Sequence, residues 1–518
     1  REASSLAVAR FDPPARFAAF YHSVRWNSLS VADTRGVQSP FRAGISVESY
    51  QFEPLLRALE QPRVRLFIAD DVGLGKTIEA ALIVRELMLR QRVRRVVVAA
   101  PPSVLAQWRD ELDARFGLTF VVVDREWLRA RRRERGWQFN PWRAHTRFVI
   151  SHALLRDPHY TAPLRDLLRD EPQGSMLVLD EAHHAAPASG ARTASDSAFT
   201  RTVRELAPLF EHRLFLSATP HNGHSASFAA LLELLDPSRF LRGVRVEPAL
   251  RKQVMVRRLK SELRRVGVEF PERKVVQVTL RDLAPDDPDL ALPERLDAYC
   301  ALREAAAAAV SREEHLNTLL SLNTLRKRLL SSVYAFHRTL GAHREGLARR
   351  AETRARSAAA ATFLLDAPGA DDERAGDDPD AIEDESRAAM AAVSAGSAAL
   401  DATPGAAHEL DALVALAREH AERPDARTRA LVQWIRDHLL EGSPPGWNDR
   451  RLLVFTEYID TQRYLVRRLR EALKDLPRFD ARVATLDGRP EHDEAREDVK
   501  RRFNADPRDE PLRVLVCT

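Results

Sequence analysis

The chain carries one short segment that is built to bind phosphate. Residues 69–77 read Ala-Asp-Asp-Val-Gly-Leu-Gly-Lys-Thr. Backbone N–H groups of a glycine turn, together with the positive N-terminus of the helix that follows, cradle anionic phosphates. Lys76 can reach the outer phosphates, and the Thr77 hydroxyl can ligate Mg²⁺. The segment therefore predicts binding of a nucleoside triphosphate.

The first glycine of the general phosphate-loop pattern is missing. That pattern is Gly-x-x-x-x-Gly-Lys-Ser/Thr, and its first position holds Asp70. A glycine-rich turn with a surface lysine is the alternative interpretation. The grouping of Gly73, Gly75, Lys76 and Thr77 between an apolar run and a helical pattern favours the phosphate loop.

A pair of carboxylates supplies the second half of a hydrolytic site. The apolar run Met176–Leu179 ends in Asp180 and Glu181. Asp180 would hold Mg²⁺ through water, and Glu181 would orient and deprotonate the attacking water, because phosphoryl transfer depends mostly on positioning and charge neutralisation. A capped strand end is the alternative interpretation. With the loop about a hundred residues upstream, we predict Lys76, Asp180 and Glu181 as catalytic residues.

These residues must be positioned by a regular alternation of strands and helices. Such alternation predicts an α/β fold with a parallel sheet covered on both faces. We assign residues 46–245 to this first lobe, after an irregular leader at 1–45. The expected strands are Val64–Ile68, Arg95–Ala100, Thr119–Val123, Arg147–Ser151, Met176–Leu179 and Arg213–Ser217, with a helix at 78–87.

The rest of the chain predicts a linker, a helical insertion and a second α/β unit. Residues 246–447 include an expected strand at Lys274–Thr279 and long helices over 293–354. Residues 366–406 have few large apolar side chains, so we expect disorder there. A second lobe starts at 448 and is incomplete at Thr518. Its expected elements are strands 451–455, 482–486 and 512–517 and helices 461–473 and 493–503.

Composition narrows the function classes. The chain has 518 residues, net charge +5 and no apolar run long enough to cross a membrane. Its two cysteines are far apart, which argues against a disulfide framework or a cysteine zinc site and fits a reducing cytoplasm. Adjacent His183 and His184 do not form a helical zinc pair. The basic runs 129–137 and 251–265 permit nucleic-acid contact, and so do the nearby tryptophans, although core packing is an equal alternative for the latter.

Taken in order, the motifs resemble those of superfamily 2 helicases, and within them the Swi/Snf-like DNA-dependent ATPases. The resemblance covers nearly all of residues 50–518, and Asp70 is typical of that family's loop. The segments that carry it are Tyr50-Gln51, Asp70–Thr77, Ala100–Leu105 with Gln107-Trp108, Asp180–His183 (a DEAH-type box), Leu216–Pro220, Arg257–Lys260, Leu453–Tyr458, Leu486–Gly488, Phe503-Asn504 and Val514–Thr518.

The resemblance implies two RecA-like P-loop lobes, ATP and Mg²⁺ as cofactors, and specific roles for further residues. An arginine that reaches the γ-phosphate is expected beyond Thr518, so this chain alone should bind ATP and hydrolyse it weakly or not at all. The implied nucleotide contacts are Gln51, Asp70, Gly73, Leu74, Gly75, Lys76 and Thr77. The implied coupling residues are His183, Ser217 and Thr219, and the implied nucleic-acid contacts are Pro101, Ser103, Gln107 and Thr456.

The expected function is an ATP-driven translocase on double-stranded DNA that moves along the duplex or remodels protein–DNA complexes. Residues 71–80 and 217–223 look closest to the bacterial branch, which holds the RapA/HepA polymerase-recycling ATPases and the Swi/Snf-like helicase of the DISARM phage-defence system. The stretch 213–240 resembles the DISARM type more, so partners in a defence complex are expected. RNA polymerase recycling, an RNA helicase and an ATP-sensing scaffold are the alternatives.

Overall fold

The computed structural model describes most of the chain as two compact units. Unit 1 is Arg1–Arg273 with Ala370–Glu373, and unit 2 is Lys274–Gly369 with Arg374–Thr518. The described residues are 13–19, 36–187, 197–219, 225–280, 283–284, 287–349, 360–361, 364, 379–398, 404–442, 446–476, 478–487 and 493–518. Much of the expected leader, the motif residues 220–223, Gly488 and the acidic residues 366–378 lie outside them.

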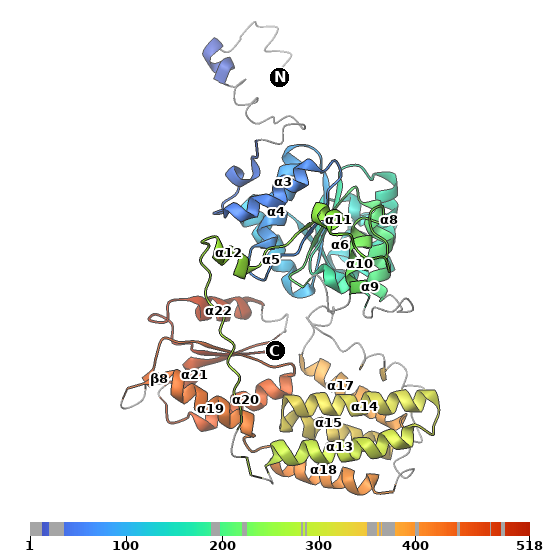
Figure 1. The fold of residues 1–518 in the computed structure, drawn as a ribbon, viewed down its shortest axis with the longest axis vertical. Helices are drawn as coiled ribbons and strands as arrows, with labels where there is room; N and C mark the ends of the chain where they lie inside the picture. The colour runs from blue at the N-terminus through green and yellow to red at the C-terminus, as the bar shows by residue number, and fades with distance from the viewer. Residues whose placement is uncertain are drawn as a thin grey trace. The chain divides into compact units, whose positions relative to one another are not determined.

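Unit 1 is built on a seven-stranded parallel sheet in the order β3-β4-β2-β5-β6-β1-β7 (Figure 1). Six of its strands coincide with the predicted apolar runs to within two residues. The two-residue β7 was not predicted, because it is too short to show a period, and its pairing with β1 extends the sheet past residue 245. The strands are β1 Arg65–Ile68, β2 Arg95–Ala100, β3 Val121–Val123, β4 Arg147–Ser151, β5 Ser175–Leu179, β6 His212–Leu216 and β7 Met255–Val256.

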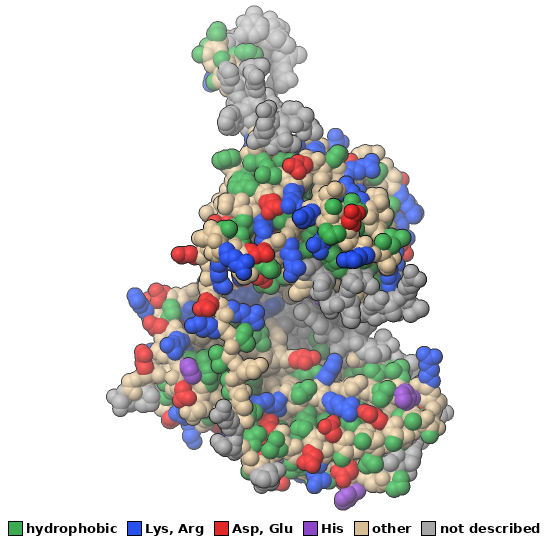
Figure 2. Space-filling view, viewed as in Figure 1, with side chains coloured by type: hydrophobic (Ala, Val, Ile, Leu, Met, Phe, Trp, Pro, Cys, Tyr) green, Lys and Arg blue, Asp and Glu red, His purple; other side chains and the backbone are tan. Residues whose placement is uncertain are grey.

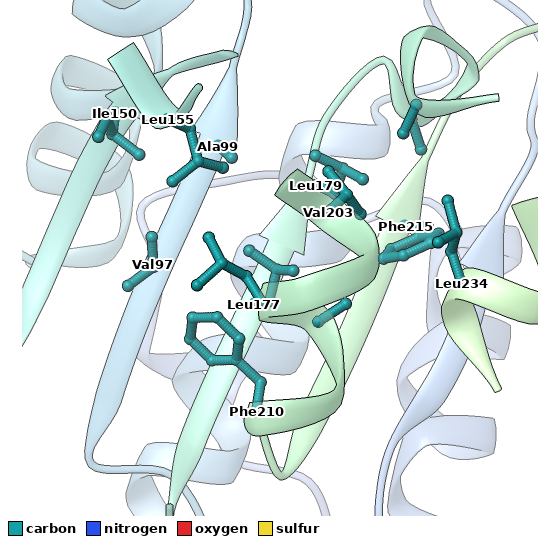
Figure 3. Close-up of a cluster of buried hydrophobic side chains, with 14 of the residues drawn as sticks. Val97, Ala99, Ile150, Leu155, Leu177, Leu179, Val203, Phe210, Phe215 and Leu234 are labelled. Atoms are coloured by element: carbon teal, nitrogen blue, oxygen red, sulfur yellow. The ribbon is translucent and has the colours of Figure 1, made fainter. Parts of the chain in front are cut away.

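Side-chain alternation along these strands fills a separate core on each face of the sheet. On β5, Leu177 and Leu179 enter one core, whereas Met176 and Val178 enter the other. Figure 3 shows the first core, where strand residues meet Phe210 and Val203 from the covering segment. The unit 1 helices are α3 Phe52–Glu60, α4 Lys76–Leu89, α5 Leu105–Phe116, α6 Arg125–Arg135, α7 His152–Leu155, α8 Pro158–Asp170, α9 Ala198–Leu206, α10 Ser225–Leu235, α11 Pro248–Val254 and α12 Lys260–Arg265.

Unit 2 contains a helical bundle whose core is made of leucines with Tyr299, Phe336 and Met390. This bundle is the predicted helical insertion. Within the described part of the chain, no helix is both long enough and apolar enough to cross a membrane. The helices are α13 Pro288–Ala307, α14 Arg312–Ser331, α15 Val333–Ala348, α17 Pro379–Ala395 and α18 Ala406–His420, followed by α19 Ala426–His438.

The prediction of disorder over 366–406 is wrong for residues 379–398. Helix α17 lies there, with Met390 and Val393 fully buried. It packs so closely on α15 that an ideal Cβ at Gly346 would lie 2.2 Å from the Ala391 carbonyl oxygen. Glycine at position 346 therefore permits this contact. Alanine-rich composition suggested weak burial, but small side chains let two helix backbones approach each other, which brings more contacts per residue.

The second half of unit 2 is an α/β layer around a three-stranded parallel sheet in the order β10-β12-β11. Its three strands and two of its helices, α20 and α22, coincide with the predicted second-lobe elements to within two residues, whereas the short α21 was not predicted. The α/β fold class is confirmed. The elements are β10 Leu452–Phe455, α20 Ile459–Ala472, α21 Phe479–Arg482, β11 Val483–Leu486, α22 Asp493–Asn504 and β12 Val514–Cys517, preceded by the antiparallel pair β8 Leu440–Glu441 and β9 Gly446–Trp447.

The strand predicted at Lys274–Thr279 is absent. Those residues have no regular structure, and Val275, Val276 and Val278 are 74%, 78% and 62% exposed. An apolar run forms a strand only where a neighbouring strand completes its hydrogen bonds. Here no strand of the described chain pairs with it.

Candidate nucleotide-binding and hydrolysis site

The phosphate loop connects the end of β1 to the start of α4, and glycine is required at its last turn. Gly73 and Gly75 have φ of +77° and +91°, a region that side chains with a Cβ rarely adopt. An ideal Cβ at Gly75 would also lie 2.5 Å from Gln51 Nε2. Helix α4 begins at Lys76, so Thr77 lies in its first turn, where the helix dipole favours anions.

Gln51 lies directly against the loop. Its side-chain Nε2 donates to the Leu74 carbonyl over 3.1 Å, and its Oε1 accepts from the Glu48 N–H over 3.1 Å. Leu74 is 1% exposed, and its carbonyl accepts this bond from Gln51 inside the loop. The structure therefore brings Gln51, Leu74 and Gly75 together, as the predicted nucleotide site requires.

The Lys76 ammonium is held by the loop's own backbone. Its Nζ donates to the carbonyls of Asp70 over 3.0 Å and Asp71 over 3.4 Å. Strands β1 and β5 both run parallel to β6, so the phosphate loop after β1 and the carboxylates after β5 lie at the same edge of the sheet. The three predicted catalytic residues thus converge on one end of the sheet.

Asp70 does not serve as a nucleotide contact through its side chain, so that prediction is wrong for its carboxylate. Asp70 is fully buried and pairs with the Arg258 guanidinium, and it also accepts from the Arg258 N–H over 2.8 Å. The same guanidinium pairs with buried Glu79 of α4 and donates to the Tyr50 carbonyl. Arg258 therefore connects Asp70 before the loop, Glu79 after it and the Tyr50 carbonyl next to Gln51. The sequence alone did not indicate this role of Arg258.

A second strand end positions the carboxylates. Asp180 follows β5 and accepts from the Trp108 indole N–H and the Glu181 N–H, over 2.8 Å and 2.9 Å. Burial raises the Asp180 pKa, and the Trp108 bond opposes that effect. Trp108 belongs to the Gln107-Trp108 segment of the family resemblance. Its bond to Asp180 was not predicted, because the two residues are 72 positions apart in the sequence.

Glu181 stands at a strained turn and begins a chain of hydrogen bonds. Its φ is +42°, a conformation that costs energy for a residue with a Cβ and recurs at active sites. His183 Nδ1 lies 3.1 Å from a Glu181 carboxylate oxygen and 2.9 Å from Ser217 Oγ. That hydroxyl accepts from the Thr219 N–H over 3.1 Å. The His183 contact is the largest of the causes that lower the Glu181 pKa, which keeps the carboxylate ionised.

The oxygen donors near the loop suit Mg²⁺ shared with a nucleotide. Mg²⁺ is usually held by one or two protein oxygens together with substrate phosphates and water. Thr77 offers a hydroxyl in the first turn of α4, and Asp180 offers a carboxylate that retains lone pairs beyond its two hydrogen bonds. Among the described residues, no three His, Cys, Asp or Glu side chains gather as a metal-ligand group.

The predicted nucleic-acid contacts differ in accessibility. Ser103 and Gln107 are exposed after β2, and Gln107 donates to Glu111 over 2.8 Å. Pro101 is buried, so a direct contact by its side chain is wrong; it leads into the turn that presents Ser103. Thr456 lies in unit 2, where its Oγ1 donates to the Tyr458 carbonyl over 3.2 Å.

The tryptophans near the arginine run divide between core and surface. Trp142 is fully buried and donates to the Tyr160 carbonyl over 2.8 Å. Trp127 packs edge-on against Phe148. Trp137 is 81% exposed, with the Arg132 guanidinium 5.0 Å from its ring centroid. Core packing therefore accounts for two of the three.

Comparison with known proteins agrees with this geometry. Residues 53–248 match the family model of the SNF2-related domain. This stretch of the chain is therefore similar to SNF2-related domains. The chain is 30% identical over 246 residues to the RNA polymerase-associated protein RapA of Serratia proteamaculans (strain 568) and, equally, of Stutzerimonas stutzeri (strain A1501). Each alignment covers 45% of this chain and 23% of the relative, so the chain spans under a quarter of those relatives.

Two solved helicase-like cores match the chain with TM-scores under 0.5. The Sulfolobus solfataricus SWI2/SNF2 ATPase core in complex with dsDNA is 15% identical, with a TM-score of 0.35 over 93% of this chain and 80% of that chain. The Pyrococcus furiosus Hef helicase domain is 16% identical, with a TM-score of 0.39 over 89% and 86%.

Proposed function

We propose that this protein is an ATP-driven translocase on double-stranded DNA. The observation that carries the proposal is the convergence of Lys76, Asp180 and Glu181 at one end of the unit 1 sheet, joined to the His183–Ser217–Thr219 chain. A phosphate loop alone would support nucleotide binding. The added base and its hydrogen-bonded chain support hydrolysis that is linked to a second event.

Each side chain has a task in that hydrolysis. Lys76 and the N-terminus of α4 bind the phosphates, and bound Mg²⁺ would neutralise charge developing on the transferred group. Glu181, kept ionised by His183, accepts the proton of the attacking water. Asp180, fixed by Trp108, would hold the metal.

The His183–Ser217 contact supports coupling between hydrolysis and the nucleic-acid track. Ser217 follows β6 and its hydroxyl is shared by His183 and the Thr219 N–H. A change in the protonation or position of Glu181 therefore shifts the segment after β6 through one side chain. In the proposal, this segment moves the DNA-contacting surface once per ATP.

The contacts with DNA would be to phosphates and therefore indifferent to base sequence. Exposed Ser103 and Gln107 are suited to such contacts. The test compares ATP turnover of the full-length protein with no nucleic acid, with duplex DNA and with duplex RNA. We expect strong stimulation by duplex DNA of any sequence. Turnover that is equal in all three conditions would refute the proposal, and stimulation by RNA alone would replace it with an RNA helicase.

For the cellular setting we infer a role in bacterial anti-phage defence of the DISARM type, on the resemblance of residues 213–240. The second candidate is RNA polymerase recycling, which the identity to RapA favours. Co-purification of the protein with core RNA polymerase at stoichiometric yield would support recycling. Loss of phage resistance on deletion of the gene, with unchanged polymerase recycling, would support defence.

A further inference from the structure

Two adjoining cavities on unit 1 form a strongly basic groove, and neither belongs to the nucleotide site. Their volumes are about 760 Å³ and 910 Å³, and both are lined by Arg57 and Lys252. We call them together the α11 groove, because α11 contributes Arg251 and Lys252 to them. Figure 2 shows Lys and Arg side chains gathered on this face of unit 1, over α11.

The groove has a large excess of positive charge. Nine arginine or lysine side chains line it, against three carboxylates. Two of those carboxylates are already engaged, since Glu53 pairs with Arg57 over 2.6 Å and Asp236 with Arg239 over 3.3 Å. Arg245, Arg251 and Lys252 are exposed, and no carboxylate of the described residues lies within ion-pair distance of them. Such a surface favours an anion.

The innermost arginine supports the same conclusion. Arg213 is the second residue of β6. It is 4% exposed and lines the first cavity. Its Nη1 donates to the Leu234 and Leu235 carbonyls, while its Nε has no hydrogen-bond partner among the described residues. Burial and the neighbouring Arg65 lower its pKa to about 9. Positive charge is therefore crowded here beyond what the protein compensates.

We propose that the α11 groove binds the phosphate backbone of duplex DNA as a second contact, separate from the surface at Ser103 and Gln107. An extended pair of hollows suits a polymer with repeated anions, and arginine's planar fork matches phosphate oxygens. The sheet order places β7 four strands from β2, which is on the order of 19 Å at the usual strand spacing. The groove therefore adds phosphate contacts rather than repeating the first ones.

The groove also lies beside the residue that holds the phosphate loop. Arg257 lines the second cavity and is the neighbour of Arg258, which pairs with Asp70 and Glu79. DNA bound in the groove would fix the segment that follows β7 and with it the loop. This inference goes beyond the proposed function, because the groove can bind DNA whether or not ATP drives movement.

The experiment measures binding of a fluorescent 40-base-pair duplex to the protein across a salt series, without nucleotide. The groove variant is Arg245→Ala/Arg251→Ala/Lys252→Ala. The matched control removes three exposed charges elsewhere on unit 1, as Arg156→Ala/Arg169→Ala/Arg201→Ala. Each lost phosphate contact lowers the slope of log affinity against log salt by about one. We expect a slope reduced by about three and affinity at least ~10-fold weaker for the groove variant, with the control within about twofold.

The results separate this inference from the proposed function. A groove variant with the wild-type slope and affinity overturns the inference, even if duplex DNA still stimulates ATP turnover. A reduced slope supports it, even if DNA fails to stimulate turnover and the translocase proposal falls. If the groove variant binds DNA normally but loses binding of poly-glutamate, the groove recognises an acidic protein and the inference is overturned. Thermal melting verifies that both variants are folded. Only variants that melt like the wild type are compared in the binding assay.

Discussion

The buried pairing of Arg258 predicts a large loss of stability when that arginine is removed. Arg258→Met keeps the length of the side chain and deletes its charge. The change leaves the buried Asp70 carboxylate without its cation and the buried Glu79 carboxyl without its hydrogen-bond donor. It also removes the donor to the Tyr50 carbonyl. Because the pair joins the phosphate loop to the segment after β7, ATP binding should weaken as well.

The size of the effect follows from burial. Removing one partner of a buried ion pair costs about 3–5 kcal/mol, because the other charge stays uncompensated. For a unit of this size that corresponds to a fall in Tm of roughly 6–20 °C. Glu79 behaves differently: burial and Asp70 raise its pKa to about 9. It is then protonated at pH 7, whereas the same carboxyl is ionised in the unfolded chain, so Glu79→Gln should not destabilise the protein at this pH.

The pH dependence has a definite sign. The folded-state pKa of Glu79 lies above its unfolded value, so folding favours the protonated form, and this contribution is lost as pH rises toward 9. For this group alone, the free energy of unfolding falls by about 1.4 kcal/mol per pH unit between the ordinary glutamate pKa of 4.5 and the folded value of about 9. Glu79→Gln should remove that slope between pH 6 and pH 9.

The assay combines chemical denaturation with hydrogen exchange of the peptides that cover residues 64–90. The matched control is Arg257→Met, a neighbour whose side chain is exposed. We expect a large shift and faster exchange for Arg258→Met and neither for the control. A free energy of unfolding for Arg258→Met within about 1 kcal/mol of that for Arg257→Met would refute the first part of the reasoning. A wild-type stability that rises from pH 6 to pH 9, with no such rise in Glu79→Gln, would refute the second.

Three further predictions come from single contacts. Gly346→Ala should destabilise unit 2 by more than about 1 kcal/mol because the new Cβ meets the Ala391 backbone. Gly341→Ala has open space around it and should stabilise α15 by up to about 1 kcal/mol. Denaturant midpoints of the two variants that shift in the same direction would contradict this. Trp108→Phe removes the bond to Asp180 and should slow ATP turnover about tenfold with little change in ATP affinity; unchanged turnover would contradict it. Ser217→Ala should keep basal ATP turnover yet lose most stimulation by DNA; equal stimulation in the variant would contradict it.

Local patterns predicted most of the fold, because each strand of unit 1 except β7 has an apolar run that fills a core. They failed where the decisive partner is remote. The Asp70–Arg258 pair spans 188 residues and the Trp108–Asp180 bond spans 72, so no local pattern indicates them. The opposite failure occurs at 274–279, where a strand-like run has no neighbour to pair with.

Composition also misled in one region. Helix α17 lies in an acidic, alanine-rich stretch. It packs against Gly346 of α15, and its Glu383 pairs with Arg328. Both partners lie more than 30 residues away. Burial of small residues against a glycine stabilises a helix that the segment's own hydrophobicity would not predict.

The central claim is that Glu181 activates water for ATP hydrolysis driven by duplex DNA. The most direct measurement is ATP turnover of the full-length protein as wild type, Glu181→Gln and Lys76→Ala, each with and without duplex DNA. The ATP affinity of each is measured beside it. We predict DNA-stimulated turnover in the wild type, a loss of at least ~100-fold in Glu181→Gln with ATP affinity retained, and loss of both in Lys76→Ala. Glu181→Gln turnover within a few-fold of the wild type would contradict the account.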